Sequence, residues 1–190
     1  MDNIEPFWKW RDRYIAQEDE RSPFYGQVSS EFEYTQAVYN YLIHPQWDEF
    51  GSSTLYLKVL YVSYNKEFAI IELMGEWNDC IGNDIMFLKR DVIDPMIAEG
   101  INKFVLIGEN VLNFHCSDNS YYEEWNDDVV SEGGWIIALN FKDYVINEMI
   151  AGDIQYYIYL SDKFKDIPWR KYKPAHIVEV LDELLMKRLS

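Results

Sequence analysis

The stretch "TLYLKVLYVSYNKEFAIIELMGEW", residues 54–77, contains two apolar runs separated by the short polar segment "NKE". In the first run Leu55, Leu57 and Val59 alternate with Tyr56 and Lys58. Successive side chains of a strand point to opposite faces, so this alternation predicts a strand. The second run, "FAIIELMGEW", is rich in residues typical of strands. Two strands joined by so short a turn predict an antiparallel β-hairpin.

The segment after the hairpin, "NDCIGNDIMFLKRDVIDPMIAEG" at 78–100, has the spacing of a helix with one apolar face, and Gly100 is placed to end it. Pro95 conflicts with a continuous helix because it lacks an N–H and clashes with the preceding turn, at a cost of about 3 kcal/mol. We therefore expect a bend near Asp91 or a helix that restarts.

The rest of the chain alternates strands and helices. The apolar runs "NKFVLIG" (102–108) and "GGWIIALNF" (133–141) predict strands that are buried on both faces. A helix at 142–153, a last strand "IQYYIYLS" at 154–161 and a helix from Pro174 follow. The order β-β-α-β-α-β-α-β-α predicts an α/β fold, with helices packed on a mixed open sheet.

The first 50 residues read as a helical extension. "PFWKWRDRYIAQED" (6–19) has apolar residues close to helical spacing, and Ser30 with Glu33 matches a capping box before a second helix at 29–44. The Val and Tyr content of that second segment leaves a strand open. The predicted organisation is an N-terminal extension (1–50), an α/β domain (51–165) and a C-terminal helix (166–190) packed on the same domain.

Composition narrows the classes of function. With 33 acidic and 17 basic side chains the formal net charge is −16. This balance argues against binding to nucleic acid or to an anionic membrane surface, and any protein partner is expected to present a basic surface. The alternative is that the charge only keeps an aromatic-rich chain soluble.

Location follows from similar arguments. The beginning of the chain lacks the pattern of a secretory signal, no run is long enough to span a bilayer, and the two cysteines show no pairing pattern. We expect a cytoplasmic protein.

The segment "NFHCSDNSYYEEW", residues 113–125, contains side chains that could act as nucleophile, metal ligand or phosphate acceptor. A nucleophilic Cys116 needs a base, but His115 is adjacent in sequence and points elsewhere, while His44 and His176 lie in the terminal segments. The nearby acids match no calcium loop and two cysteines make no structural zinc site, so we predict no metal and no cofactor. Two interpretations remain for Ser117: it receives a phosphate, or it caps the following helix together with Asp118.

Two landmarks and the order of elements carry a family resemblance. "GEWN" (75–78) ends a strand where STAS domains, of the anti-sigma-factor-antagonist type, have Gly-x-Leu-Asp. "FHCS" (114–117) is similar to their Phe-x-Asp-Ser, and "GGWIIALNFKDYVINEMIAGDI" (133–154) resembles their Gly-Gly strand and closing helix. The resemblance covers roughly residues 54–162.

The resemblance implies a non-enzymatic regulatory domain that binds a protein partner, with Ser117 as phospho-acceptor. Phosphorylation would disfavour an acidic or apolar partner surface and release the complex. The interaction pole that it implies consists of seven residues: Gly75, Asn78, Asp79, His115, Cys116, Ser117 and Asp118. Two alternatives stay open, namely an enzyme that uses Cys116 with His115, and a ligand-binding or architectural domain that self-associates through its aromatic side chains.

Overall fold

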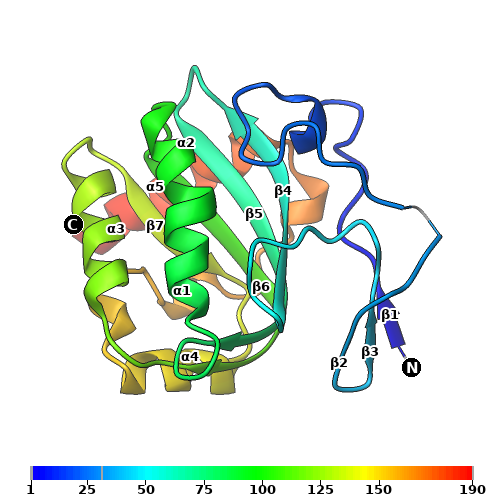
Figure 1. Cartoon of the computed structure of the whole chain (residues 1–190). Helices are drawn as coiled ribbons and strands as arrows, with labels where there is room; N and C mark the ends of the chain where they lie inside the picture. Colours follow the sequence, from blue (N-terminus) through cyan, green and yellow to red (C-terminus); the bar gives the residue numbers. More distant parts are fainter. Residues whose placement is uncertain (1, 31, 190) are drawn as a thin grey trace.

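The computed structural model describes residues 2–30 and 32–189. Its centre is a mixed four-stranded sheet in the order β4-β5-β6-β7, with β4 antiparallel to β5 and with β5, β6 and β7 parallel to one another (Figure 1). The strands are β4 (Leu55–Ser63), β5 (Phe68–Asn78), β6 (Lys103–His115) and β7 (Trp135–Leu139). The predicted hairpin and the α/β class with a mixed open sheet are therefore confirmed.

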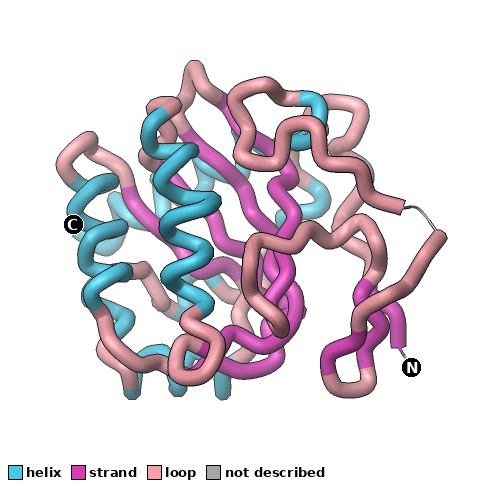
Figure 2. The backbone as a smooth tube through the Cα atoms, in the orientation of Figure 1, coloured by secondary structure: helices cyan, strands magenta, loops and turns pink. Residues whose placement is uncertain are grey.

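Helices connect the parallel strands and cover the sheet. They are α1 (Asp84–Phe87), a π-helical segment (Leu88–Ile93), α2 (Asp94–Ala98), α3 (Ser120–Val130), α4 (Asp143–Ala151) and α5 (Pro174–Leu189). In Figure 1 the α1–α2 column and α3 lie in front of the sheet, whereas α5, in red, lies behind it. The tube drawing in Figure 2 shows the same layers, with the loops of the N-terminal region beside β4.

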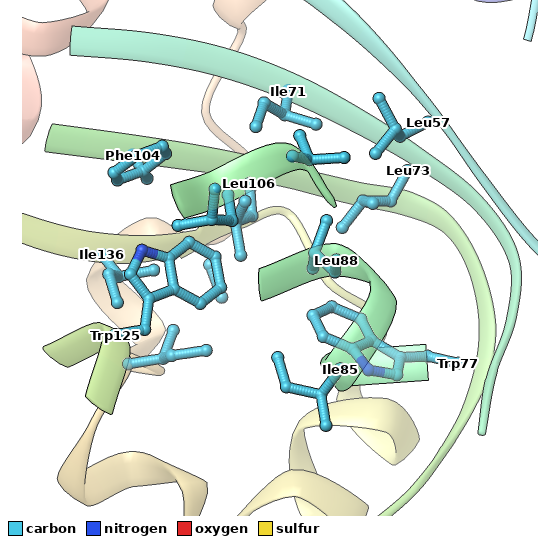
Figure 3. Close-up of a cluster of buried hydrophobic side chains, with 14 of the residues drawn as sticks. Leu57, Ile71, Leu73, Trp77, Ile85, Leu88, Phe104, Leu106, Trp125 and Ile136 are labelled. Atoms are coloured by element: carbon cyan, nitrogen blue, oxygen red, sulfur yellow. The ribbon is translucent and has the colours of Figure 1, made fainter. Parts of the chain in front are cut away.

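The sheet has an apolar core on each face because its strand side chains alternate. Figure 3 shows the larger core, in which Trp77, Leu106 and Trp125 pack with Leu88 between the sheet and helices α1 to α3. The smaller core on the opposite face joins Ile70 and Val105 to aromatic side chains from the two ends of the chain and to α5. Burial of large rings on both faces explains much of the aromatic content.

The conflict at Pro95 is resolved within the helical column. The π-helical segment ends at Ile93, and α2 begins at Asp94, so that Pro95 lies in the first turn of α2. The backbone nevertheless stays helical without a break from Asp84 to Ala98. The expected irregularity near Asp91 is therefore a π-helical segment directly before the proline, and the helix does not end and restart.

The prediction of helices in the first 50 residues is wrong. Among residues 2–30 and 32–50, which the structure describes, there are the short strands β1 (Asp2–Ile4), β2 (Ala37–Val38) and β3 (Tyr41–Ile43) and a 3-10 turn at Ala16–Glu18. The strands form a separate sheet in the order β1-β3-β2.

Local interactions explain part of this error. Tyr39 adopts φ 52, which supports a tight turn between β2 and β3. Ser30 Oγ accepts the N–H of Phe32 and of Glu33 at 3.1 and 3.0 Å, so the expected capping box forms only a local turn. Phe32 is 83% exposed rather than part of a buried stripe.

The predicted last strand at 154–161 is also wrong. A 3-10 turn, Ile154–Tyr156, occupies its beginning, and only Tyr159 pairs with β7, as an isolated parallel bridge to Ile137. Asp153 has φ 63 at the start of this segment and turns the chain away from an extended course. The sheet therefore ends at β7, and the order of elements after α4 differs from the prediction.

Among the helices of the described residues, none combines the length and the apolar character that crossing a bilayer requires.

Candidate functional site

The turns that follow β5 and β6 lie side by side. Asn78 and His115 are direct partners in the parallel ladder, and the Asp79 N–H donates to the His115 carbonyl at 2.8 Å. One residue further on, Cys80 Sγ donates to the Cys116 carbonyl at 2.9 Å. The last residues of neighbouring parallel strands meet at one edge of a sheet, which is where α/β proteins commonly bind their ligands. We call Asn78–Cys80 together with His115–Asp118 the β5–β6 pole.

A hollow of about 360 Å³ opens at this pole. Three of the seven predicted residues line it, and four further residues were not singled out from the sequence. The full lining is Asp79, Cys80, Asn83, Ile85, Ser117, Asp118 and Tyr121. Asn78, His115 and Cys116 flank the hollow through the strand pairing and the backbone hydrogen bonds given above.

Gly75 does not belong to the pole in which the family resemblance placed it. It lies inside β5, which continues to Asn78, and it pairs with Leu55 of β4 and Val111 of β6. Its φ is 114, and a Cβ at this position would lie 2.1 Å from the Thr54 carbonyl oxygen. The glycine is therefore required by backbone geometry at a strand irregularity.

Asp79 forms the buried floor of the pole. Its Oδ1 accepts the indole N–H of Trp77 at 3.1 Å and the backbone N–H of Ile85 at 2.9 Å, and its Oδ2 accepts the Tyr122 hydroxyl. Burial raises the pKa of Asp79 to about 6, because these donors only partly offset the loss of solvent. One carboxyl group thus fastens β5 to the starts of α1 and α3.

The neighbouring polar groups shape the turn itself. Asn78 Oδ1 accepts the N–H of Ile81 at 3.0 Å, an arrangement that stabilises a turn. The Asn78 N–H donates to Asp84 Oδ2 at 2.8 Å. Asp84 is fully buried, and burial raises its pKa. The sequence singled out Asn78 for the pole, and these contacts give it a turn-forming role.

Cys116 is poorly placed for nucleophilic catalysis. Its thiol donates to Asn119 Oδ1 at 3.1 Å, and burial, together with the negative charge of Asp79, raises its pKa to about 11. The thiolate is the reactive form of cysteine, and this environment disfavours it at neutral pH. His115 is directed elsewhere, since its Nε2 lies 4.0 Å from Glu76 Oε1.

Ser117 and Asp118 lead into α3. Asp118 Oδ1 accepts the N–H of Ser120, the first helical residue, at 2.6 Å, and also its hydroxyl. These hydrogen bonds lower the pKa of Asp118. Ser117 is exposed, and its Oγ accepts the N–H of Asp118 at 2.6 Å. The N-cap residue of α3 is Asn119, so neither of the two capping candidates occupies that position, and of the two only Asp118 contacts the helix, through Ser120.

One group of carboxylates outside the pole has the spacing of metal ligands. Oxygens of Asp94, Glu124 and Asp128 lie within 4.8 Å of one another. The ammonium group of Lys89 lies among them, 3.1 Å from Asp128 and 3.5 Å from Glu124, with a shorter contact to Asp94. A buried cation already lies between these carboxylates and offsets part of their charge, so the group forms a structural ion-pair network.

The residues that sequence reasoning missed are Cys80, Asn83, Ile85 and Tyr121 in the lining, and Tyr122 below it. Tyr121 and Tyr122 lie within the quoted segment 113–125 and have helical spacing with Trp125, but periodicity alone does not show which tyrosine faces a carboxylate. Cys80 carried a signal, as one of only two cysteines in the chain.

Neither a scan against protein-family models nor a search of curated proteins finds a match for this chain.

Proposed function

We propose that this chain is a non-enzymatic protein-interaction domain of the STAS type, that it binds its partner through the β5–β6 pole, and that phosphorylation of Ser117 releases that partner. The observation that carries the proposal is the ladder pairing of Asn78 with His115. It brings the turn after β5 to the exposed hydroxyl of Ser117, as the resemblance to STAS domains requires.

The surface chemistry of the pole indicates the kind of partner. Ile81, in the turn after β5, is 90% exposed, whereas the polar floor below it is already satisfied by internal hydrogen bonds. Interfaces usually have an apolar centre and a polar rim, and long-range charge steers the encounter. The partner therefore offers an apolar contact to Ile81 within a basic surface that the net charge of −16 attracts.

The effect of phosphorylation at Ser117 follows from the same surface chemistry of the pole. A phosphoryl group adds about 1.5 to 2 negative charges and a strongly held hydration shell. Beside the ionised Asp118 and an apolar contact at Ile81, that charge would have to be desolvated in the complex. Phosphorylation of Ser117 therefore weakens the contact, although the partner is attracted to the protein as a whole.

The test is affinity capture from the cells that express the protein, with matched variants. Ser117→Asp and Ile81→Glu are expected to lose a common set of bound proteins that the wild type and Ser117→Ala retain. Ser131→Asp is the control, because it makes the same charge change at an exposed serine at the other end of α3. Identical protein sets for all five forms would contradict both the site and the switch.

The alternative of a cysteine enzyme has its own test. Iodoacetamide should label the exposed Cys80 faster than Cys116 at pH 7, since the pKa of Cys116 is raised. Preferential labelling of Cys116 would favour the enzyme instead.

A further inference from the structure

A second hollow lies far from the pole in sequence, between the N-terminal segment and β4. The N-terminal segment, blue in Figure 1, runs beside this strand. The hollow has a volume of about 160 Å³ and is lined by residues from both segments. An engineered cavity of about 150 Å³ accepts a benzene ring, so the space suits one six-membered ring.

The walls are apolar and held in place. Trp10 is 6% exposed and Leu60 is 4% exposed, and both line the hollow with Phe7. The rings of Phe7 and Trp10 meet edge to face with centroids 5.1 Å apart, and Trp169 contacts both from behind at 5.0 and 5.8 Å. The aromatic walls are thus fixed before any ligand binds, as in most small-molecule sites.

Two cations complete the lining. Lys58, 7% exposed, has partners, since its Nζ lies 3.4 Å from Asp48 Oδ2 and 3.3 Å from Gln17 Oε1. Arg11 differs. Its Nη2 has no hydrogen-bond partner and forms only a long ion pair with Glu5, at 3.7 Å, while the Arg11 side chain as a whole is 35% exposed. A guanidinium donates in a planar fork that matches a carboxylate, and a buried donor without an acceptor is unfavourable.

We propose that this hollow binds a small organic monocarboxylate, whose ring or short chain lies against Trp10 and Leu60 and whose carboxylate accepts hydrogen bonds from Arg11. Asp48 neutralises Lys58 internally, which leaves Arg11 as the cation for the ligand. Glu5 is exposed and competes weakly for the same guanidinium. The site is independent of the β5–β6 pole and of the partner proposed there.

Benzoate is the probe, and benzyl alcohol is its uncharged counterpart. Calorimetric titration of the full chain should give a dissociation constant for benzoate of about 1 mM or below. Benzyl alcohol should bind about tenfold more weakly, because it lacks the charge that pairs with Arg11. The indole N–H resonance of Trp10 should shift in proportion to occupancy.

Three variants locate the contact. Arg11→Met should weaken benzoate binding about tenfold without changing that of benzyl alcohol, and Glu5→Gln should strengthen it severalfold by removing the competing acid. Arg13→Met is the control for net charge, because Arg13 is exposed and does not line the hollow. If Arg11→Met fails to fold, Arg11→Lys takes its place. Lysine keeps the charge but lacks the planar fork, so the loss of benzoate affinity should be smaller than that expected for Arg11→Met.

Absence of saturable benzoate binding at about 10 mM, equal affinity for benzoate and benzyl alcohol, or equal loss in the Arg11 and Arg13 variants would each overturn the proposal.

Discussion

Two buried carboxyl groups of β5 and the turn after it are held in different ways. Asp79, at the β5–β6 pole, accepts hydrogen bonds from Trp77, Ile85 and Tyr122, which belong to three elements. Glu72, on the opposite face of the sheet, accepts one N–H, that of Phe7 at 2.9 Å.

Burial raises both pKa values, that of Asp79 to about 6 and that of Glu72 to about 7. The contrast separates two contributions of a buried acid. Asp79 stabilises by satisfying donors that have no other partner, whereas Glu72 affects stability mainly through its charge.

The largest effect should come from Asp79→Ala. The substitution leaves three buried donors without an acceptor, each worth about 1–3 kcal/mol, so the free energy of unfolding should fall by about 3 kcal/mol or more. Urea denaturation followed by far-UV circular dichroism measures the change. Asp79→Asn is the matched control, because it keeps an acceptor oxygen and should cost about 1 kcal/mol or less. A loss below about 1 kcal/mol for the alanine variant would show that the three hydrogen bonds contribute little.

A substitution at Glu72 should change the free energy of unfolding less than Asp79→Ala does, and by an amount that depends on pH. Its pKa is 4.5 in the reference state and about 7 in the fold, so the folded state binds more protons between these values. Its contribution to stability is therefore complete below about pH 4.5 and is lost as the pH rises through 7.

Glu72→Gln removes this loss because the amide never ionises and can still accept the N–H of Phe7. Relative to the wild type, the free energy of unfolding of the variant should rise by about 3 kcal/mol between pH 4.5 and pH 8. Urea denaturation across that range, with the difference taken at each pH, isolates Glu72 from Asp79. Parallel pH profiles of the two proteins would mean that Glu72 is solvated in the fold.

The sequence predicts those parts of the molecule that local patterns determine. The β4–β5 hairpin follows from alternation and a short turn. The meeting of Asn78 with His115 was implied only by the family resemblance, because the predicted strand at 102–108 stops before His115, where β6 ends. The first 50 residues are different. There β1 pairs with β3 across almost forty residues, and no periodicity in either segment encodes that contact.

The same limit applies to the candidate site. Ser117 and Asp118 were found because they follow a predicted strand, and Asp79 was included through the family resemblance. The donors to Asp79 were not found, because Tyr122 reaches it from a helix more than forty residues away. Arg11 was assigned to a helix, and its position in a hollow depends on packing between the two ends of the chain.

Lys89 extends the comparison to a buried cation. Its ammonium group is fully buried, but its partners Asp94, Glu124 and Asp128 are 43%, 57% and 41% exposed. Burial alone would lower the pKa of Lys89, but the hydrogen bonds that Lys89 donates to Asp94 and Asp128 outweigh burial and raise the pKa.

Lys89→Met keeps the volume of the stem but leaves three carboxylates facing one another. Because solvent reaches these carboxylates, the free energy of unfolding should fall by about 1–2 kcal/mol, which is less than for Asp79→Ala. Screening by 1 M NaCl should reduce this loss. Urea denaturation at low and high salt measures both quantities. A loss that salt does not change would indicate a packing defect at position 89 rather than repulsion.

The smallest effect is expected at Ser117, directly above the floor that Asp79 forms. Ser117→Ala removes only the acceptor for the Asp118 N–H, at an exposed position where water can replace it. The free energy of unfolding should change by less than about 0.5 kcal/mol, measured by the same denaturation. At the pole, Asp79 would then be required for the stability of the fold, whereas Ser117 would not. A loss of about 1 kcal/mol or more would instead make Ser117 part of the structure of the turn, and phosphorylation there would disturb the fold as well as the contact with a partner.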